Sequence, residues 1–187
     1  MPGFRVIAGT AKGRRLKLVP GDSTRPIMDR VKESLFNIIG AGIAEATFLD
    51  LFGGTGGVGI EALSRGAARA TFIDSSRLAI KTIRDNLETV NFSQRATVIR
   101  GDALAFLKAQ AEASFDYIYI APPQYLDLWT RALSLIDAQP AWLNPDGWAI
   151  AQIDPVEYSE PALQHLTLVD KRKYGSTLLC FYERPGE

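Results

Sequence analysis

The sequence predicts an α/β fold built on a doubly wound, mostly parallel sheet that finishes with an antiparallel C-terminal hairpin strand. Short apolar runs alternate with helical patterns across residues 47–153, which is typical of parallel strands joined by crossover helices. Five glycines lie among residues 53–59, directly after the first apolar run. Two β-rich runs, residues 166–174 and 177–182, are joined at Gly175-Ser176 and predict the closing hairpin.

The individual elements follow from local pattern. Apolar residues at positions 28, 31, 35, 38 and 39 have helical spacing, with Pro26 just before them and Gly40 or Gly42 as the end. Ser75 or Ser76 is a suitable cap for the helix that follows the second strand. We expect strands at residues 48–51, 70–73, 96–99, 117–120 and 147–153, and helices at 58–65, 77–90, 103–111 and 126–136.

The N-terminal stretch is basic and alternates in polarity. Residues 4–8 and 14–19 predict two strands of a β-hairpin, with residues 9–13 as its turn. Residues 1–32 carry eight basic and two acidic side chains. A solvated basic hairpin or a polyanion-binding extension accounts for this excess. We therefore divide the chain into an extension, residues 1–22, and a main domain, residues 23–187.

Composition excludes several classes of function. The 187 residues include 21 basic and 21 acidic side chains, so global charge points to no partner. Cys180 and His165 are the only residues of their types, which excludes an intrachain disulfide and a thiolate metal cage and argues against a histidine triad. No apolar run approaches a membrane span and no signal peptide is evident. We expect a monomeric protein of the cytosol or an organelle stroma that needs no metal and no membrane.

The strand–glycine loop–helix unit is typical of a nucleotide-type cofactor site. Gly54-x-Gly56-x-x-Gly59 fits the dinucleotide pattern, so an NAD(P) oxidoreductase is one reading. Asp50 argues against it, because a carboxylate at the loop repels a pyrophosphate and suits the cationic α-amino group of S-adenosylmethionine (SAM). A purely structural glycine turn is the third reading. The candidate cofactor residues of this unit are Asp50, Phe52, Gly53, Gly54, Thr55 and Gly56.

Two further carboxylates follow the next strands. Asp74 comes 18 residues after Gly56, a suitable place for an acceptor of ribose hydroxyls, and Ser75 follows it. Asp102 is placed to accept from an adenine amino group, and the backbone of Ala103 adds a donor. Each such Asp alone is commonly a helix cap or turn former. Three of them at strand ends predict one cofactor crevice.

Two motifs carry a resemblance to known families. Asp50-x-Phe52-x-Gly54-x-Gly56 resembles the first motif of class I SAM-dependent methyltransferases, and Pro122-Pro123 with a following aromatic is similar to the fourth motif of those that methylate exocyclic base amines. The run from Arg25-Pro26 through Asp29 to Asn37, together with residues 49–56 and 61–67, resembles the RsmD family of 16S ribosomal RNA guanine-N2 methyltransferases. This resemblance extends over nearly the whole chain.

The resemblance implies an RNA substrate, ribosomal RNA or the small ribosomal subunit, and a base reached by flipping or in a loop. It also implies that the basic N-terminal hairpin and residues 171–173 contact phosphates. The candidate RNA contacts are Arg5, Lys12, Arg14, Arg15, Arg25, Arg30, Lys171, Arg172 and Lys173.

One departure from the family pattern affects the catalytic loop. The acidic residue expected before Pro122 is Ala121 here, and Gln124 precedes Tyr125. We hypothesise that Gln124 accepts from the guanine amine while Tyr125 stacks on the ring. The candidate catalytic residues are Ala121, Pro122, Pro123, Gln124 and Tyr125. A weakened or silent SAM-binding relative and a DNA adenine-N6 methyltransferase are the alternatives.

Overall fold

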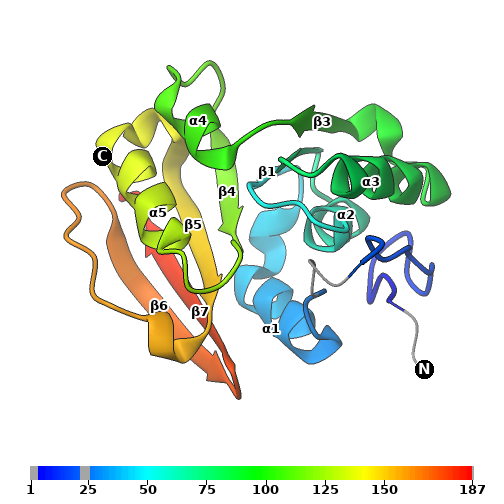
Figure 1. The fold of residues 1–187 in the computed structure, drawn as a ribbon, viewed down its shortest axis with the longest axis horizontal. Coiled ribbons are helices and arrows are strands. Elements are labelled where there is room, and N and C mark those ends of the chain that lie inside the picture. Colours follow the sequence, from blue (N-terminus) through cyan, green and yellow to red (C-terminus); the bar gives the residue numbers. More distant parts are fainter. Residues whose placement is uncertain (1–3, 22–25, 187) are drawn as a thin grey trace. The chain divides into compact units, whose positions relative to one another are not determined.

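The computed structural model describes residues 4–21 and 26–186. The chain divides into two compact units, Met1–Gly101 and Asp102–Glu187, and Figure 1 shows the helices and strands of each. Within the described ranges, no helix combines the length and apolar character needed to cross a membrane.

The first unit is a parallel three-stranded arrangement with helices in the connections. Its strand order is β3-β2-β1, and both pairings are parallel. The register places Asp50 opposite Phe72 and Asp74 opposite Arg100, so these strands end at one edge. The elements are α1 (Asp29–Ile39), η1 (Gly40–Ile43), β1 (Thr47–Asp50), α2 (Gly57–Ser64), β2 (Arg69–Asp74), α3 (Arg77–Thr89), η2 (Ser93–Arg95) and β3 (Ala96–Arg100).

The second unit joins two parallel strands to an antiparallel hairpin. Its strand order is β4-β5-β7-β6, with β4 and β5 parallel and β7 antiparallel to both of its neighbours. The predicted closing hairpin is therefore confirmed. The elements are α4 (Ala103–Lys108), β4 (Phe115–Ile120), α5 (Leu128–Ala138), η3 (Pro140–Trp142), β5 (Leu143–Ile153), η4 (Pro155–Glu157), β6 (Thr167–Tyr174) and β7 (Thr177–Glu183).

The core of the first unit follows from the apolar pattern. The helix α1 buries Val31, Leu35, Phe36 and Ile39, the positions three or four residues apart that form one face. The ring of Phe36 stacks on that of Phe48 in β1, with 6.2 Å between centroids. This packing fixes α1 against the strand that leads into the glycine loop.

The predicted N-terminal hairpin is present, but its two strands are much shorter than expected. Residues 4–19 form only one isolated antiparallel bridge, Arg5 with Arg15, in place of two full strands. Leu16 N donates to Phe4 O (2.8 Å) and Val6 N to Arg14 O (3.0 Å) across this bridge. Other peptide N–H groups of the segment bind side chains of the first unit. Ile7 N donates to Glu61 Oε1 (2.9 Å), Ala11 N to Ser64 Oγ (2.9 Å) and Lys17 N to Asn86 Oδ1 (2.7 Å).

Three other predicted boundaries differ in the structure. The helix predicted from residue 126 begins at Leu128, because Asp127 has a φ of 53° that a helix does not allow. The helix predicted to residue 111 ends at Lys108, because the Gln139 side chain binds Ala109 O (3.0 Å) and Ala111 N (2.7 Å). The strand predicted from residue 147 begins at Leu143.

Candidate functional site

The glycine loop connects β1 to α2 and turns sharply. Gly56 has a φ of 81°, in the left-handed region that favours glycine. A Cβ on Gly53 would lie 2.8 Å from Ile83 Cδ1, so a larger side chain fits there only if the Ile83 side chain moves. The loop backbone is therefore held close to its neighbours and presents no side chain at these two positions.

The carboxyl group of Asp50 is buried at the end of β1. Only 2% of Asp50 is exposed, and among the described residues its Oδ1 atom has no hydrogen-bond partner. Burial, and then the nearby charge of Asp74, raise the pKa of Asp50 to about 7, while hydrogen bonds from the backbone N–H groups of Gly59 and Phe52 act in the opposite direction. A buried acceptor without a donor is costly. The position fits a cationic ligand group, which would remove that cost.

Asp74 lies beside the same loop and joins it to α3. Its Oδ2 accepts from Gly54 N (2.9 Å) and its Oδ1 from Ser76 N (2.8 Å). Each carboxylate oxygen has a second lone pair that can accept from a ligand hydroxyl. Ser76 Oγ accepts from Ala79 N (3.2 Å), which confirms it as the cap of α3. Asp50, Phe52, Asp74 and the loop glycines are thus together in one unit.

Asp102 and Ala103 begin the second unit. The side chain of Asp102 is exposed and caps α4, with Oδ1 accepting from Ala105 N (2.8 Å), while Ala103 is buried. The structure therefore gives Asp102 a capping role, and its predicted contact with an adenine stays a prediction. Ser75 is exposed in the first unit, and its carbonyl lies 3.5 Å from Arg100 Nε.

The proline loop follows β4 in the second unit. Ala121 and Pro122 are half-buried, whereas Pro123, Gln124 and Tyr125 are exposed. Tyr125 has a φ of 66°, an uncommon conformation for a large side chain, and 65% of it is exposed. An exposed aromatic held in a strained loop is suited to stacking on a flat ligand.

Two acidic residues that the sequence analysis missed hold this loop. Glu157 Oε1 accepts from Tyr125 N (2.6 Å), and Asp154 Oδ2 accepts from Tyr125 OH (3.3 Å). They also form a capping box around η4, directly after β5. The spacing Asp-x-x-Glu was the available signal, because it is the pattern of a capping box.

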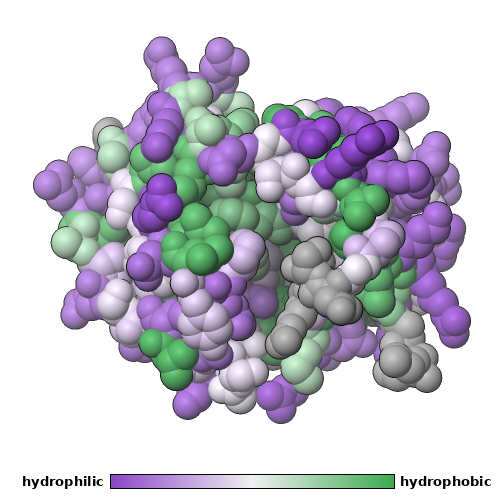
Figure 2. All heavy atoms as spheres, in the orientation of Figure 1, coloured by the Kyte–Doolittle hydropathy of each residue, from purple (hydrophilic) through white to green (hydrophobic). Residues whose placement is uncertain are grey.

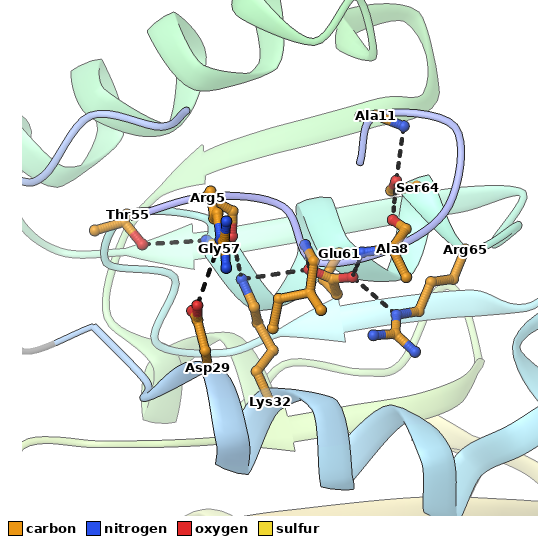
Figure 3. A network of polar contacts seen from close by, with 11 residues as sticks. Arg5, Ala8, Ala11, Asp29, Lys32, Thr55, Gly57, Glu61, Ser64 and Arg65 are labelled. Carbon is orange, nitrogen blue, oxygen red and sulfur yellow. Dashed lines mark hydrogen bonds and ion pairs between the residues drawn. The ribbon is translucent and has the colours of Figure 1, made fainter. Parts of the chain in front are cut away.

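A buried polar network ties residues 5–11 to α1 and α2 (Figure 3). Lys32 Nζ lies 3.3 Å from Glu61 Oε1 and donates to Arg5 O (2.8 Å). The other Glu61 oxygen accepts from Ala8 N (3.0 Å) and Arg65 Nε (2.8 Å). Desolvation is the largest cause that lowers the pKa of Lys32, and the charge of Glu61 opposes it. The sequence contained a signal for each residue of the pair. Lys32 lies next to the apolar face of its helix, and Glu61 is the single acidic residue of an apolar helix.

The N-terminal segment also contacts the glycine loop. Asn86 Nδ2 donates to Thr55 O (2.9 Å) and to Lys17 O (3.0 Å). A Cβ on Gly57 would lie 2.2 Å from Phe4 Cζ, so the Phe4 ring packs on the first turn of α2. The segment is therefore part of the support of the loop, which the sequence analysis did not foresee.

The predicted RNA contacts lie in both units, and the described ones are exposed. Arg5 pairs with Asp29 (3.6 Å), and Arg172 pairs with Asp170 (3.0 Å). Arg25 lies outside the described residues. The remaining exposed residues of the set are Lys12, Arg14, Arg15, Arg30, Lys171 and Lys173. In the ranges that the structure describes, no group of three or more His, Cys, Asp or Glu side chains is arranged to hold a metal ion.

Comparison with known proteins identifies a matching family model and several similar proteins. The model of the family described as conserved hypothetical protein 95 matches residues 4–183. YlbH of Bacillus subtilis is 41% identical over 185 residues, which cover 98% of this chain and 100% of that protein. Ribosomal RNA small subunit methyltransferase D of Haemophilus influenzae is 38% identical over 183 residues, covering 96% of this chain and 93% of that protein.

The fold comparison agrees over the full length. The solved structure of YhhF from Escherichia coli superposes with a TM-score of 0.87 at 30% identity, covering 98% of this chain and 99% of that one. The fold and the acidic glycine-loop site define a class I, Rossmann-like methyltransferase, so this chain is an enzyme. It belongs to the RsmD family, whose model is the one that spans residues 4–183.

Proposed function

We propose that this enzyme transfers a methyl group from SAM to the exocyclic N2 amine of a guanine in small-subunit ribosomal RNA. The main support for SAM as the cofactor is the buried Asp50 Oδ1 atom, which has no hydrogen-bond donor among the described residues. The relative from Haemophilus influenzae, which is named for ribosomal RNA of the small subunit, supports the substrate side.

The residues around the glycine loop have separate tasks. SAM is the cofactor and supplies an electrophilic methyl group on its sulfonium. Asp50 accepts from the α-amino group, because an ionised buried carboxylate is stabilised by a nearby cation. Asp74 keeps lone pairs for hydroxyls while it holds Gly54 N at 2.9 Å. Asp102 and Ala103 contact the adenine in this proposal.

The proline loop receives the base. Tyr125 would stack on the guanine ring, and Gln124 would accept a hydrogen bond from one N–H of the amine and so orient the nitrogen lone pair for attack. Pro122 and Pro123 make the loop rigid. A paired, stacked amine is inaccessible, so the base must be flipped out or already lie in a loop. Positioning of the amine then supplies most of the rate enhancement.

The basic residues of the N-terminal segment and of β6 contact RNA phosphates. Each phosphate contact adds to the salt dependence of binding, because it releases counterions from the RNA. We expect the enzyme to act as a monomer on the RNA or the assembling subunit, in the cytosol or an organelle stroma, with residues 1–22 as an RNA-contacting extension of the domain formed by residues 23–187.

Labelled SAM and small subunits from cells that lack this methylation provide the test. Wild-type enzyme should incorporate label at the N2 position of one guanine, identified by nuclease digestion and mass spectrometry. Gln124→Ala should incorporate label more slowly, by about 10²-fold or more, and Gln124→Glu should keep part of the rate because it retains an acceptor. Equal rates for wild type and Gln124→Ala would remove Gln124 from the mechanism.

Ala121 favours a second candidate function, a weakened methyltransferase that binds SAM and RNA but transfers the methyl group slowly. This alternative predicts normal SAM binding in calorimetry with only slow transfer to small subunits or 16S rRNA. Label found on DNA adenine in place of ribosomal RNA would overturn the substrate proposal and favour an adenine-N6 methyltransferase.

A further inference from the structure

A groove of about 430 Å³ lies on the outer face of α3, next to the edge strand β3. Its lining comes from two elements of the first unit and is dominated by cations. The lining residues are Arg77, Ile80, Lys81, Arg84, Asp85 and Arg100. Figure 2 shows hydrophilic side chains gathered over the region where Figure 1 places α3 and β3.

The groove carries a net positive charge that its one carboxylate does not cancel. Asp85 Oδ2 is engaged by Lys81 Nζ (2.9 Å) and by Lys17 Nζ (3.5 Å). The hydrogen bond from Lys81 is the main reason that the pKa of Asp85 is lowered. In the described parts of the chain, no ion pair involves Arg77, Arg84 or Arg100.

The groove is continuous with two features that the proposed function uses. At one end Arg100 lies opposite Asp74 in the sheet register, and its Nε lies 3.5 Å from Ser75 O. At the other end Lys17 reaches Asp85, and the Arg14 guanidinium donates to Thr89 O at the end of α3. A basic surface therefore extends from the edge of the cofactor loop to the N-terminal segment.

We propose that this groove binds the phosphate backbone of the RNA substrate, a contact surface additional to the N-terminal segment and β6. The inference rests on the proposed function. Arg77, Lys81 and Arg84 are four and three residues apart on one helix face, and span roughly 10 Å along its axis. One guanidinium group can donate two parallel N–H hydrogen bonds to two oxygens of the same phosphate.

The composition of the groove fits RNA better than a protein partner. Protein interfaces have an apolar or aromatic centre with few charges. The one apolar lining residue here is Ile80, which is only 4% exposed. A polyanion needs no such centre, because its affinity comes from phosphate contacts.

Charge reversal within the groove tests the proposal. We would measure binding of wild type, Arg84→Glu and Arg77→Glu/Arg84→Glu to a 16S rRNA transcript and to undermethylated small subunits over a salt series. The matched control is Arg69→Glu, an exposed arginine at the opposite end of β2 from Asp74. Affinity of the groove variants should fall on the order of tenfold or more, with a salt slope smaller by about one per arginine. SAM affinity and the unfolding midpoint of all variants should equal those of wild type.

The outcomes separate this inference from the proposed function. If the groove variants and Arg69→Glu bind the transcript as tightly as wild type does, the groove is not an RNA surface, although methylation by wild type would leave the proposed function standing. If the variants lose binding to subunits but not to the transcript, the partner is a ribosomal protein and the proposal is overturned. If wild type neither binds nor methylates either RNA probe, both fail.

Discussion

The ammonium of Lys32 and the carboxylate of Glu61 lie 3.3 Å apart, and neither side chain is exposed to solvent. The pair is satisfied on both sides, since Lys32 donates to Arg5 O and Glu61 accepts from Ile7 N and Ala8 N. A buried pair of this kind contributes little net energy compared with an apolar pair, but loss of one partner leaves an uncompensated charge. Attachment of the N-terminal segment therefore depends on α1, which carries Lys32, and on α2, which carries Glu61.

Lys32→Met should lower the free energy of unfolding, but by less than the ~3–5 kcal/mol expected for a buried charge with no partner, because Glu61 keeps its contact with Arg65 Nε (2.8 Å). Urea denaturation followed by circular dichroism measures this change. The exposed lysine Lys81 also pairs with a carboxylate, and Lys81→Met should leave the urea midpoint unchanged. Equal midpoints for Lys32→Met and wild type would show that the buried pair does not hold the segment.

Asn86→Ala should weaken both the fold and SAM binding. The amide of Asn86 is fully buried and binds Thr55 O, Lys17 O and Lys17 N, so its removal leaves buried backbone groups without partners. We expect a loss of about 1–3 kcal/mol in the free energy of unfolding and a higher Kd for SAM in calorimetry. Asn37→Ala, an exposed asparagine of α1, is the control. A SAM affinity equal to that of wild type would mean that the loop keeps its shape without this link.

Asp50 makes stability depend on pH in a defined direction. Its pKa is raised to about 7 in the folded protein, whereas an unfolded Asp ionises near pH 4. The protonated form favours the fold, so this contribution is complete below about pH 4 and is lost as pH rises through 7. Asp50→Asn should therefore stabilise the ligand-free protein by a few kcal/mol near pH 8, since one pKa unit is worth about 1.4 kcal/mol, with the gain shrinking toward pH 4.

The same group should make SAM affinity depend on pH. A cationic amino group prefers the ionised carboxylate, so the Kd for SAM should rise as pH falls below about 7. Calorimetry between about pH 5.5 and 7.5 measures the slope. Asp50→Asn should bind weakly and with no slope, while Glu33→Gln, an exposed carboxylate of α1, should behave like wild type. A slope that persists in Asp50→Asn would assign the titration to another group.

Ala121→Asp should raise the transfer rate. It restores an acceptor at the position where the family pattern has an acidic residue, and one positioned acceptor is worth about 10²–10³ in rate. Single-turnover transfer to undermethylated subunits measures the change, with SAM affinity as the check that cofactor binding is intact. A rate no higher than that of wild type would indicate that Gln124 or another group already supplies the acceptor.

Glu157→Ala should loosen the proline loop while leaving the cofactor loop untouched. Glu157 accepts from Tyr125 N at 2.6 Å and holds Tyr125 at a φ of 66°. Without the carboxylate the strained conformation loses its support, so we expect a raised KM for RNA and an unchanged Kd for SAM. Glu160→Ala, which removes an exposed acid close by in the chain, is the control. If both variants have the KM of wild type, the contact does not position Tyr125.

The alternating strands and helices and the closing hairpin were predictable because each depends on patterns a few residues long. The run at β1, the cap at Ser76 and the turn at Gly175-Ser176 all act locally. The glycine loop and its acid were recognisable for the same reason. The boundaries that moved, at Lys108 and Leu128, depend on a distant side chain and on an unusual φ.

The chain's order of residues is sufficient to specify the strand–glycine loop–helix unit and the acidic residues at its strand ends, because propensity and periodicity act over short distances. The arrangement of residues 4–19 is different, since it depends on Glu61, Ser64 and Asn86, which lie about 50–70 positions further along. Folding alone brings these partners together. It places the short N-terminal hairpin against the residues that support the cofactor loop. It also buries Lys32 and Asp50, so that leaving either charge without a partner is costly.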